Sequence, residues 1–261
     1  MYSIRITNSR DQTLTLTEDE SKYQIMEIAG LSSPGASVNT TAIYGMAGGV
    51  FNSSHIENRA ITITLKVNGY NDNNRMALYN CFPTGEKVRF WYSTDAFGSD
   101  YVYIDGYVEK LECNAFTNKV IAQISIICPF PYFRAQTPTT RASATSHSFT
   151  YNGSVECGAE FVFSIIASTN TVGVVDGSGN LMKLAANITG YFQAGDTVRI
   201  STRQGEKSAV LIHGSYTTNV IKWLTNDSTF LNIKQGTNSF SVIDESACRF
   251  GLIYNTTYRG V

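Results

Sequence analysis

Apolar and polar residues alternate with a period of two through most of the first half of the chain. Residues 61–67, which read ITITLKV, alternate without a break, as expected for a strand with one face on a core. The same pattern predicts further strands at 1–7, 88–92, 101–109 and 120–128. Within 101–109, Asp105 and Gly106 predict a bulge or a close approach of another backbone, because glycine has no side chain to obstruct it.

One segment of the first half departs from this period and predicts a short helix near residues 74–81. Asn73 or Asn74 is a suitable N-cap, and the helix is expected to run from Arg75 to Cys81 and to stop before Phe82-Pro83. On this reading Met76, Tyr79 and Leu78 face inward.

Short predicted strands return in the second half, separated by glycine-containing turns such as DGSGN at 176–180. They lie at 148–151, 159–167, 171–175, 181–184, 197–201, 208–212, 230–233, 239–242 and 249–258. Many short strands with such turns predict a β-sandwich or jelly roll, so the whole chain is expected to be all-β with one short helix.

A small, polar stretch without periodicity separates the two halves. Residues 137–148 read TPTTRASATSHS, a composition that suits a linker. We therefore predict a first domain over residues 1–138, a linker over 139–148 and a second domain over 149–261.

The amino-acid composition argues against some classes of function. The 261 residues carry 20 Lys and Arg against 21 Asp and Glu, a net charge of −1, which argues against a nucleic-acid-binding groove or a polybasic membrane surface. This balance does not exclude a pore that DNA crosses without being held. Charged residues are only 16%, below the roughly 25% of an average domain, while 43% hydrophobic residues suffice for a core.

No apolar run approaches the roughly 18 residues that span a bilayer, and the first residues show no signal-peptide pattern. We expect synthesis and folding in a cytoplasm, and no membrane partner. The five cysteines are an odd number without a CxxC pair, which favours small buried hydrophobes over disulfides or a zinc site.

Motifs for catalysis or metal binding are lacking. His55, His147 and His213 are far apart in sequence and belong to no HExxH, HxH or GxSxG motif. The loop at 176–180 begins like a calcium loop, but Leu181 and Asn187 stand where Gly and Glu are needed, so a hairpin turn is preferred. We expect no catalytic, cofactor-binding or metal-ligating residue, no cofactor, and no enzymatic activity.

Two other features have a structural and a functional reading. The glycine cluster GMAGG at 45–49 lacks the frame of a phosphate-binding loop and predicts a flexible loop or hairpin tip. The aromatic residues of the second half fit a sugar-binding face, although core packing is the commoner role in an all-β domain. They are Tyr191, Phe192, Tyr216, Trp223, Tyr254 and Tyr258.

Several local patterns follow one another in a fixed order along the first domain. They are GLSSP at 30–34, the glycine cluster, NRAITITLKV at 58–67, NDNNRMAL at 71–78, FPTGEKV at 82–88, IDGYVE at 104–109 and QISIICPFPYF at 123–133. This ordered series resembles the distal tail protein (Dit) family of long-tailed bacteriophages over about residues 1–135, and YRGV at 258–261 is similar to that family's usual ending.

This resemblance implies a structural protein of the virion tail tip or baseplate, made in the cytoplasm of the bacterial host. It implies a split β-barrel N-terminal domain, related to tail-tube subunits, that forms a homohexameric ring, and a galectin-like C-terminal β-sandwich. The implied partners are the tail tube protein, the tail-associated tip protein and, in some phages, the receptor-binding protein, with DNA passing through the lumen. Strands near 61–67 and 120–128 are then expected in the ring, and residues 45–49 on an arm that touches a neighbour or the tube.

Two alternatives from other classes remain open. The second domain alone suits a carbohydrate-binding module that mediates adhesion to the host cell wall through its aromatic residues. A hydrolase acting on cell-wall polymers is the other, because paired carboxylates on separate strands are invisible in a sequence.

Overall fold

The computed structural model describes residues 2–17, 22–45, 47–68, 72–94, 100–114 and 119–261. The chain forms two compact units. Unit 1 comprises Met1–Gln136 together with Tyr258–Val261, and unit 2 comprises Thr137–Thr257. The chain therefore passes between the units twice.

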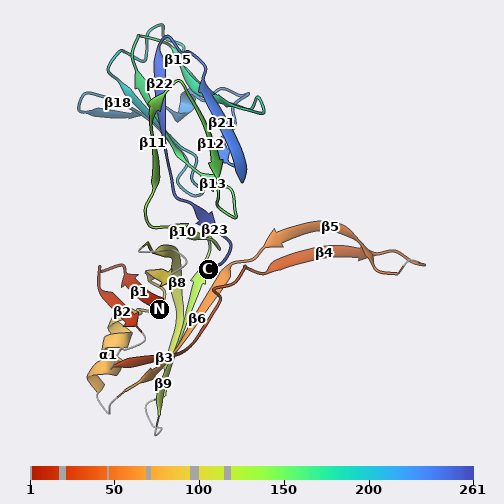
Figure 1. Ribbon diagram of the computed structural model, residues 1–261, viewed down its shortest axis with the longest axis vertical. Helices are drawn as coiled ribbons and strands as arrows, with labels where there is room; N and C mark the ends of the chain where they lie inside the picture. The colour runs from red at the N-terminus through yellow and green to blue at the C-terminus, as the bar shows by residue number, and fades with distance from the viewer. Residues whose placement is uncertain (1, 18–21, 46, 69–71, 95–99, 115–118) are drawn as a thin grey trace. The chain divides into compact units, whose positions relative to one another are not determined.

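Unit 1 is built on one large antiparallel sheet with the order β2-β1-β7-β8-β9-β6-β3 (Figure 1). Its strands are β1 (Tyr2–Asn8), β2 (Thr13–Thr17), β3 (Tyr23–Ala29), β6 (Arg59–Val67), β7 (Lys87–Thr94), β8 (Val102–Cys113) and β9 (Val120–Cys128). Two short strands, β10 (Phe133–Ala135) and β23 (Thr257–Tyr258), pair with each other, and β10 also pairs with β8. A separate hairpin consists of β4 (Ala36–Ala42) and β5 (Gly49–Ile56).

The predicted alternation of these strands positions the core of unit 1. Every second residue of β6 from Arg59 to Val67 is buried, and the same period appears in β9. Since side chains of a strand point alternately to its two faces, this period places one face on the core. The fully buried side chains include Ile4, Ile6, Ile61, Ile63, Leu65, Phe90, Ile124, Ile126 and Phe133.

The helix of unit 1, α1 (Asp72–Cys81), begins earlier than predicted and presents another face. Its buried residues are Leu78 and Cys81, whereas Met76 and Tyr79, which were expected to face inward, are 51% and 38% exposed. The predicted caps Asn73 and Asn74 lie inside the helix. With only ten residues and a weakly apolar sequence, the helix has a core stripe too narrow to be located by periodicity.

Gly106 lies where another backbone approaches closely, as predicted. A Cβ atom there would lie 2.9 Å from the backbone carbonyl oxygen of Ile127 on the adjacent strand β9, and 2.6 Å and 2.8 Å from the side chains of Ile126 and Cys128. The irregularity in the pairing of β8 with β9 lies slightly further along, between Val108 and Lys110.

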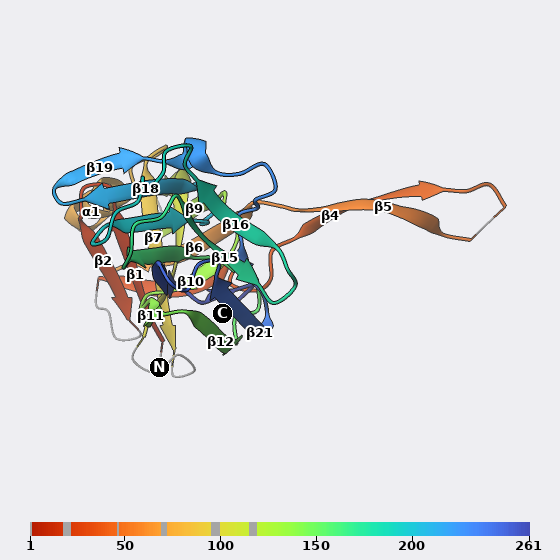
Figure 2. The same cartoon turned by 90° about the horizontal axis from the view of Figure 1, so that it is seen from above.

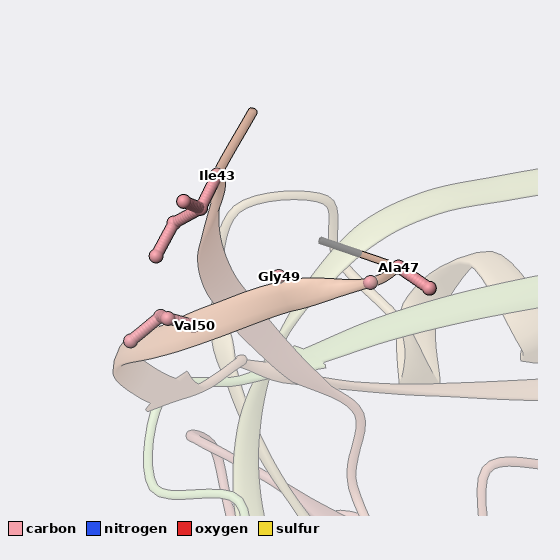
Figure 3. A pocket seen from close by; sticks show the side chains of 5 residues that line it. Ile43, Ala47, Gly49 and Val50 are labelled. Carbon is pink, nitrogen blue, oxygen red and sulfur yellow. The ribbon is translucent and has the colours of Figure 1, made fainter. Parts of the chain in front are cut away.

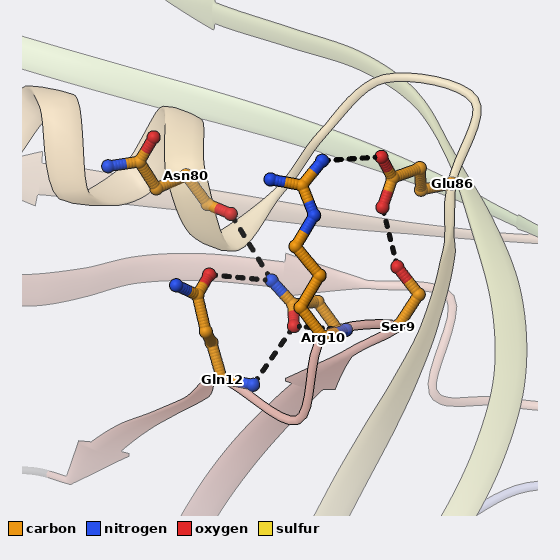
Figure 4. A network of polar contacts seen from close by, with 6 residues as sticks. Ser9, Arg10, Gln12, Asn80 and Glu86 are labelled. Atoms are coloured by element: carbon orange, nitrogen blue, oxygen red, sulfur yellow. Dashed lines mark hydrogen bonds and ion pairs between the residues drawn. The ribbon is translucent and has the colours of Figure 1, made fainter.

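The turn between β1 and β2 is fixed by the buried side chain of Asn8 (Figure 4). Its Oδ1 accepts hydrogen bonds from the backbone N–H groups of Arg10 and Gln12, both at 3.0 Å. Its Nδ2 donates to Gln12 Oε1 at 3.0 Å and to the carbonyl of Asn80 in α1 at 3.2 Å. All polar atoms of this buried amide are thus paired, which holds the hairpin against the end of the helix.

Unit 2 is a sandwich of a six-stranded and a four-stranded antiparallel sheet, with orders β11-β22-β14-β17-β18-β19 and β12-β21-β15-β16. The first sheet contains β11 (Thr139–Ala144), β14 (Glu160–Ile165), β17 (Thr197–Ser201), β18 (Ser208–His213), β19 (Tyr216–Asn219) and β22 (Cys248–Tyr254). The second contains β12 (Ser146–Tyr151), β15 (Thr171–Asp176), β16 (Leu181–Ala185) and β21 (Gly236–Val242). A small pair, β13 (Cys157–Gly158) with β20 (Asn232–Ile233), and the 3₁₀-helix η2 (Ile221–Trp223) complete the unit.

Aromatic side chains fill the space between these two sheets. Phe161 of β14 meets Phe240 of β21 edge to face, with ring centroids 5.6 Å apart, and also stacks near Phe250. Phe149 of β12 stacks on Tyr254 of β22 at 5.7 Å. Strands from both sheets thus contribute to one core. The all-β class with one α-helix in the described part of the chain is confirmed.

The predicted linker over 139–148 is wrong. Residues Thr139–Ala144 form β11, which pairs with β22, and β12 begins at Ser146. The prediction failed because β11 is the edge strand of its sheet and buries none of its residues, so its sequence needs no apolar alternation. The second domain also ends earlier than predicted, because the last four residues belong to unit 1.

Candidate functional site: assembly surfaces

The large sheet of unit 1 ends in two strand edges without a partner in the described part of the chain. β2 pairs with β1 alone, and β3 pairs with β6 alone. The outer N–H and C=O groups of such strands are a template for pairing with another chain. Five residues join β2 to β3, so the sheet curls round until its two edges lie close together, but the described residues show no ladder between them.

The hairpin of β4 and β5 with its turn, residues 36–56, is here called the arm. It is inserted between β3 and β6, and it extends away from the sheet of unit 1 as a two-stranded ribbon (Figures 1 and 2). Every residue of both strands is exposed. The arm contains no Lys, Arg, Asp or Glu, and the glycine cluster lies at its tip, as predicted, with Met46 outside the described residues.

The strand register divides the arm into two different faces. Residues directly opposite each other in an antiparallel pair share a face, and the face alternates along each strand. Ala36 pairs with Ile56, Val38 with Ser54, Thr40 with Phe51 and Ala42 with Gly49, which gives an apolar face. The other face is formed by Ser37 with His55, Asn39 with Ser53 and Thr41 with Val50, and is mainly polar.

The apolar face of the arm is exposed to an extent that requires an explanation. Val38, Phe51 and Ile56 have exposed fractions of 57%, 61% and 41%. An isolated two-stranded hairpin is at best marginally stable in water, and contiguous exposed apolar side chains mark interaction sites. The arm therefore has the character of a surface that another protein covers.

The tip of the arm carries a small apolar hollow rather than a ligand pocket (Figure 3). It is lined by Ile43, Ala47, Gly48, Gly49 and Val50, and its volume is about 30 Å³. About 10–15 Å³ of such space holds one water molecule, so the hollow has room for only a few waters.

Arg59, at the start of β6, fixes the root of the arm. Its side chain is buried and donates hydrogen bonds to the backbone carbonyls of Gly30 and Ser32, which precede the arm. The root is closed by a 3.0 Å bond from the N–H of Glu57 to the carbonyl of Gly35. Because its base is held in this way, the ribbon leaves the sheet from a defined position.

The aromatic residues proposed for a sugar-binding face do not assemble into one. Phe192 and Tyr254 are buried in the core of unit 2, and Tyr191 and Trp223 pack against that core with ring centroids 5.8 Å apart. Tyr216, at 76% exposure, stands out in the turn region of β18 and β19, and Tyr258 belongs to unit 1. Core packing accounts for most of this set, so the carbohydrate-binding alternative gains no support.

The three histidines also remain separate. His55 is on the arm, His147 contacts the carbonyl of Phe250 at 3.0 Å, and His213 Nδ1 lies 2.6 Å from Asp196 Oδ1. Asp196 is 3% exposed and also accepts a bond from the N–H of Gln193, so it organises a turn. In the described residues no group of three or more His, Cys, Asp or Glu is arranged to hold a metal ion.

The loop at 176–180 is the tight hairpin turn that its sequence predicted. The carboxylate of Asp176 accepts hydrogen bonds from the N–H groups of Ser178 and Asn180 and from the Asn180 side chain, at 2.8–2.9 Å. These bonds hold the carboxylate within its own turn.

The cysteines are all free thiols. Burial raises the pKa of the Cys81 and Cys248 thiols to about 11 and that of Cys128 to about 12. Such thiols are protonated at neutral pH and therefore unreactive. Among the helices that the structure describes, none is long and apolar enough to cross a membrane.

The arm is the feature that sequence reasoning located only at its tip. Its strands were missed because neither face is buried in this chain, so the usual alternation is weak. The available signal was the long run without charge, residues 36–56, with short Val-, Thr- and Ser-rich segments on both sides of a glycine cluster.

Comparison with known proteins agrees with this architecture. Residues 152–258 match the family model described as siphovirus-type tail component, C-terminal domain. The crystal structure of the Dit protein of phage SPP1, described as a paradigm of the hub adsorption apparatus in phages that infect Gram-positive bacteria, matches with a TM-score of 0.73 at 13% identity. The match covers 97% of this chain and 98% of that chain. Comparison with curated protein sequences gives no match.

Two structures of the phage p2 baseplate in its activated conformation, with strontium and with calcium, also match. Their TM-scores are 0.56 and 0.54 at 12% and 13% identity, over 97% of this chain and 98% and 97% of those chains. At such identities these likenesses establish the fold.

Together, these comparisons show that residues 152–258 match a phage tail component domain and that the whole chain has the fold of a phage tail hub protein. The predicted resemblance to distal tail proteins is thus confirmed, with residues 152–258 matching the C-terminal domain of the Dit family.

Proposed function

We propose that this chain is the hub of the tail tip, where six copies close into a ring through unit 1. The ring joins the tail tube to the tail-associated and receptor-binding proteins, and DNA passes through its lumen. The observation that carries this proposal is the split in the sheet of unit 1, where β2 and β3 each lack a second partner among the described residues. A heterologous interface that joins one edge region to the other generates a ring when its rotation closes.

The arm supports the same assembly. Its apolar face, with Val38, Phe51 and Ile56, is exposed in the single chain and suits burial against a neighbouring copy. The SPP1 protein is described as a hub, and the p2 matches are parts of a baseplate, which agrees with a position at the tail tip.

Passage of DNA agrees with the charge of the chain. Tight binding to duplex DNA depends on lysine and arginine that neutralise phosphates, and a chain of net charge −1 has no excess of them. The proposed hub performs no catalysis, and its role is to connect other proteins of the assembly. It is made in the host cytoplasm and ends at the tail tip of the virion.

Mass photometry of the purified chain tests the ring directly. We expect a species of about six times the 28.7 kDa mass of one chain, in proportions that rise with concentration. A monomer at every concentration, with or without neighbouring tail proteins, would contradict the proposal.

Matched variants test the contribution of the arm. Val38→Ser removes an apolar side chain from the apolar face, and Val50→Ser makes the same change on the polar face at a similar exposure of 47%. We expect Val38→Ser to weaken the assembly by about tenfold in concentration and Val50→Ser to leave it within about threefold. Equal effects of the two variants would show that the apolar face is not the contact.

A further inference from the structure

A straight row of arginine and aromatic side chains crosses the outer face of the unit 1 sheet. In the strand register, Arg5 of β1 stands opposite Trp91 of β7, Trp91 opposite Tyr103 of β8, and Tyr103 opposite Arg134 of β10. The residues next to them in these strands, such as Ile4 and Phe90, are buried in the core. The four residues, here called the Arg–aromatic row, therefore lie on the face away from the core.

The row is held rigid by stacking. The Arg5 guanidinium lies 4.4 Å from the ring centroid of Trp91 and 4.8 Å from that of Tyr101. Arg89 lies 4.3 Å from the ring centroid of Tyr103, and the rings of Trp91 and Tyr103 are 5.1 Å apart. These contacts immobilise the side chains before a partner arrives, which reduces the entropic cost of binding.

Hydrogen bonds hold two of these aromatic side chains. Trp91 Nε1 donates to Thr7 Oγ1 at 3.3 Å, and the hydroxyl of Tyr101 donates to Ser3 Oγ at 3.0 Å.

Positive charge gathers at the row. Arg89 and Lys87 share one carboxylate, that of Asp105, at 2.6 Å and 3.4 Å. Within the described part of the chain, Arg5 and Arg134 form no ion pair, and the Nε of Arg5 is buried without a hydrogen-bond acceptor. Among the described residues, four cations lie at or beside the row, and the ion pairs there use the single carboxylate of Asp105.

We propose that the Arg–aromatic row docks a carboxylate-bearing segment of another protein. Arginine presents a planar fork of donors that matches a carboxylate, and Trp, Tyr and Arg are the residues that dominate binding energy at protein interfaces. The proposal is independent of ring formation, because it concerns a different face of unit 1 from the sheet edges and the arm.

Stacking also argues for a protein rather than a single-stranded nucleic acid as the partner. Arg5 lies over the rings of Trp91 and Tyr101, and Arg89 lies over that of Tyr103. Binding of single strands uses free aromatic faces on which bases stack, and here the arginines occupy those faces.

Fluorescence anisotropy with the full chain tests this inference. The probe is a fluorescein-labelled peptide of alternating Glu and Ser, and the competing probe is a labelled oligothymidylate. We expect the peptide to bind at low salt and to bind more weakly as salt rises. Arg5→Gln and Arg134→Gln are each expected to lower its affinity by about tenfold, whereas Lys22→Gln, the same charge change at an exposed site, leaves it within about twofold.

A conservative variant and thermal melting control for loss of folding. Arg5→Lys keeps the charge but loses the planar fork, so an affinity between those of the wild type and Arg5→Gln is expected, with thermal melting showing that each variant is folded. Absence of peptide binding, or an equal loss in Lys22→Gln, would overturn the proposal. Tighter binding of the oligothymidylate that is lost in the Arg5 and Arg134 variants would also overturn it and assign the row to nucleic acid.

Discussion

The guanidinium of Arg59 donates a hydrogen bond to the backbone carbonyl of Arg259, which lies 200 positions further along the chain. The same group donates to the carbonyl of Pro131 at 2.7 Å and to that of Gly30 at 2.5 Å. One buried side chain thus joins the root of the arm, the segment after β9 and the terminal residues of unit 1. Among the described residues, its charge is spread over backbone carbonyls and no carboxylate pairs with it.

Replacement of Arg59 by alanine is expected to destabilise unit 1 by about 3 kcal/mol. The variant leaves several carbonyl groups without a donor in a buried site, and each unpaired buried polar group costs about 1–3 kcal/mol. Urea denaturation measures the loss. Arg10→Ala is the control, since Arg10 forms an exposed ion pair with Glu86 and is expected to contribute less than about 1 kcal/mol. Equal losses in the two variants would refute the role given to Arg59.

Gly106→Ala is expected to cost about 2–3 kcal/mol, because the new Cβ would overlap Ile126 and Cys128 in the well-packed core. Gly205→Ala provides the comparison. Gly205 has φ of +78° and open space around it, so only the backbone strain of about 1 kcal/mol is expected. Thermal unfolding measures the loss of stability in each variant. A larger loss in Gly205→Ala than in Gly106→Ala would contradict the close approach at Gly106.

The stability contributed by Asp105 is expected to depend on pH. Burial alone would raise the pKa of this carboxyl, but hydrogen bonds and charges from Arg89 and Lys87 outweigh it and hold the pKa below its usual value. A lowered pKa in the folded state stabilises the fold above the unfolded pKa of about 3.9, and this stabilisation is lost as pH falls through the folded value. Asp105→Asn is therefore expected to cost about 1–2 kcal/mol at pH 7, with the difference shrinking in acid.

Denaturation of both proteins between neutral and acidic pH checks this dependence. Asp72→Asn is the matched control, because Asp72 pairs with Arg75 on the surface at 84% exposure. It is expected to change stability by no more than about 0.5 kcal/mol at any pH. A pH-independent difference for Asp105→Asn would show that its charge is not the cause.

One thiol of the native protein is expected to react faster with Ellman's reagent than the other four, although burial raises the pKa of this thiol as well. Cys113 is partly exposed, while Cys81, Cys128, Cys157 and Cys248 are buried. Reaction requires access and a thiolate, and burial reduces both. Stopped-flow absorbance should show a single fast thiol, which Cys113→Ser removes, and release of the others only on unfolding. Several fast thiols in the native state would contradict the burial of the other four.

The strands of the two cores were predictable because their alternation is physically enforced. Residues 120–128 and 197–201 were predicted with the bounds that the structure has, since each second residue must be apolar to face the core. Met76 and Tyr79 were misplaced because a short helix with few apolar residues offers several equivalent stripes.

The proposed assembly surfaces could not be predicted from the sequence, because no burial in the single chain enforces an alternating pattern there. In the single chain, the arm and β11 bury no side chain, so no pattern marks them as strands. The Arg–aromatic row consists of Arg5, Trp91, Tyr103 and Arg134, which are far apart in sequence, and only the strand order places them side by side. A pattern local in sequence cannot reveal a relationship created by pairing of distant strands.

The two passages of the chain between unit 1 and unit 2, at Gln136–Thr137 and at Thr257–Tyr258, have a mechanical consequence. A pull on unit 2 is shared by two covalent connections in parallel, so each carries part of the load. Two connections also oppose free swivelling, because rotation about one would twist the other. A unit attached by two connections transmits torque as well as tension to the unit that anchors it.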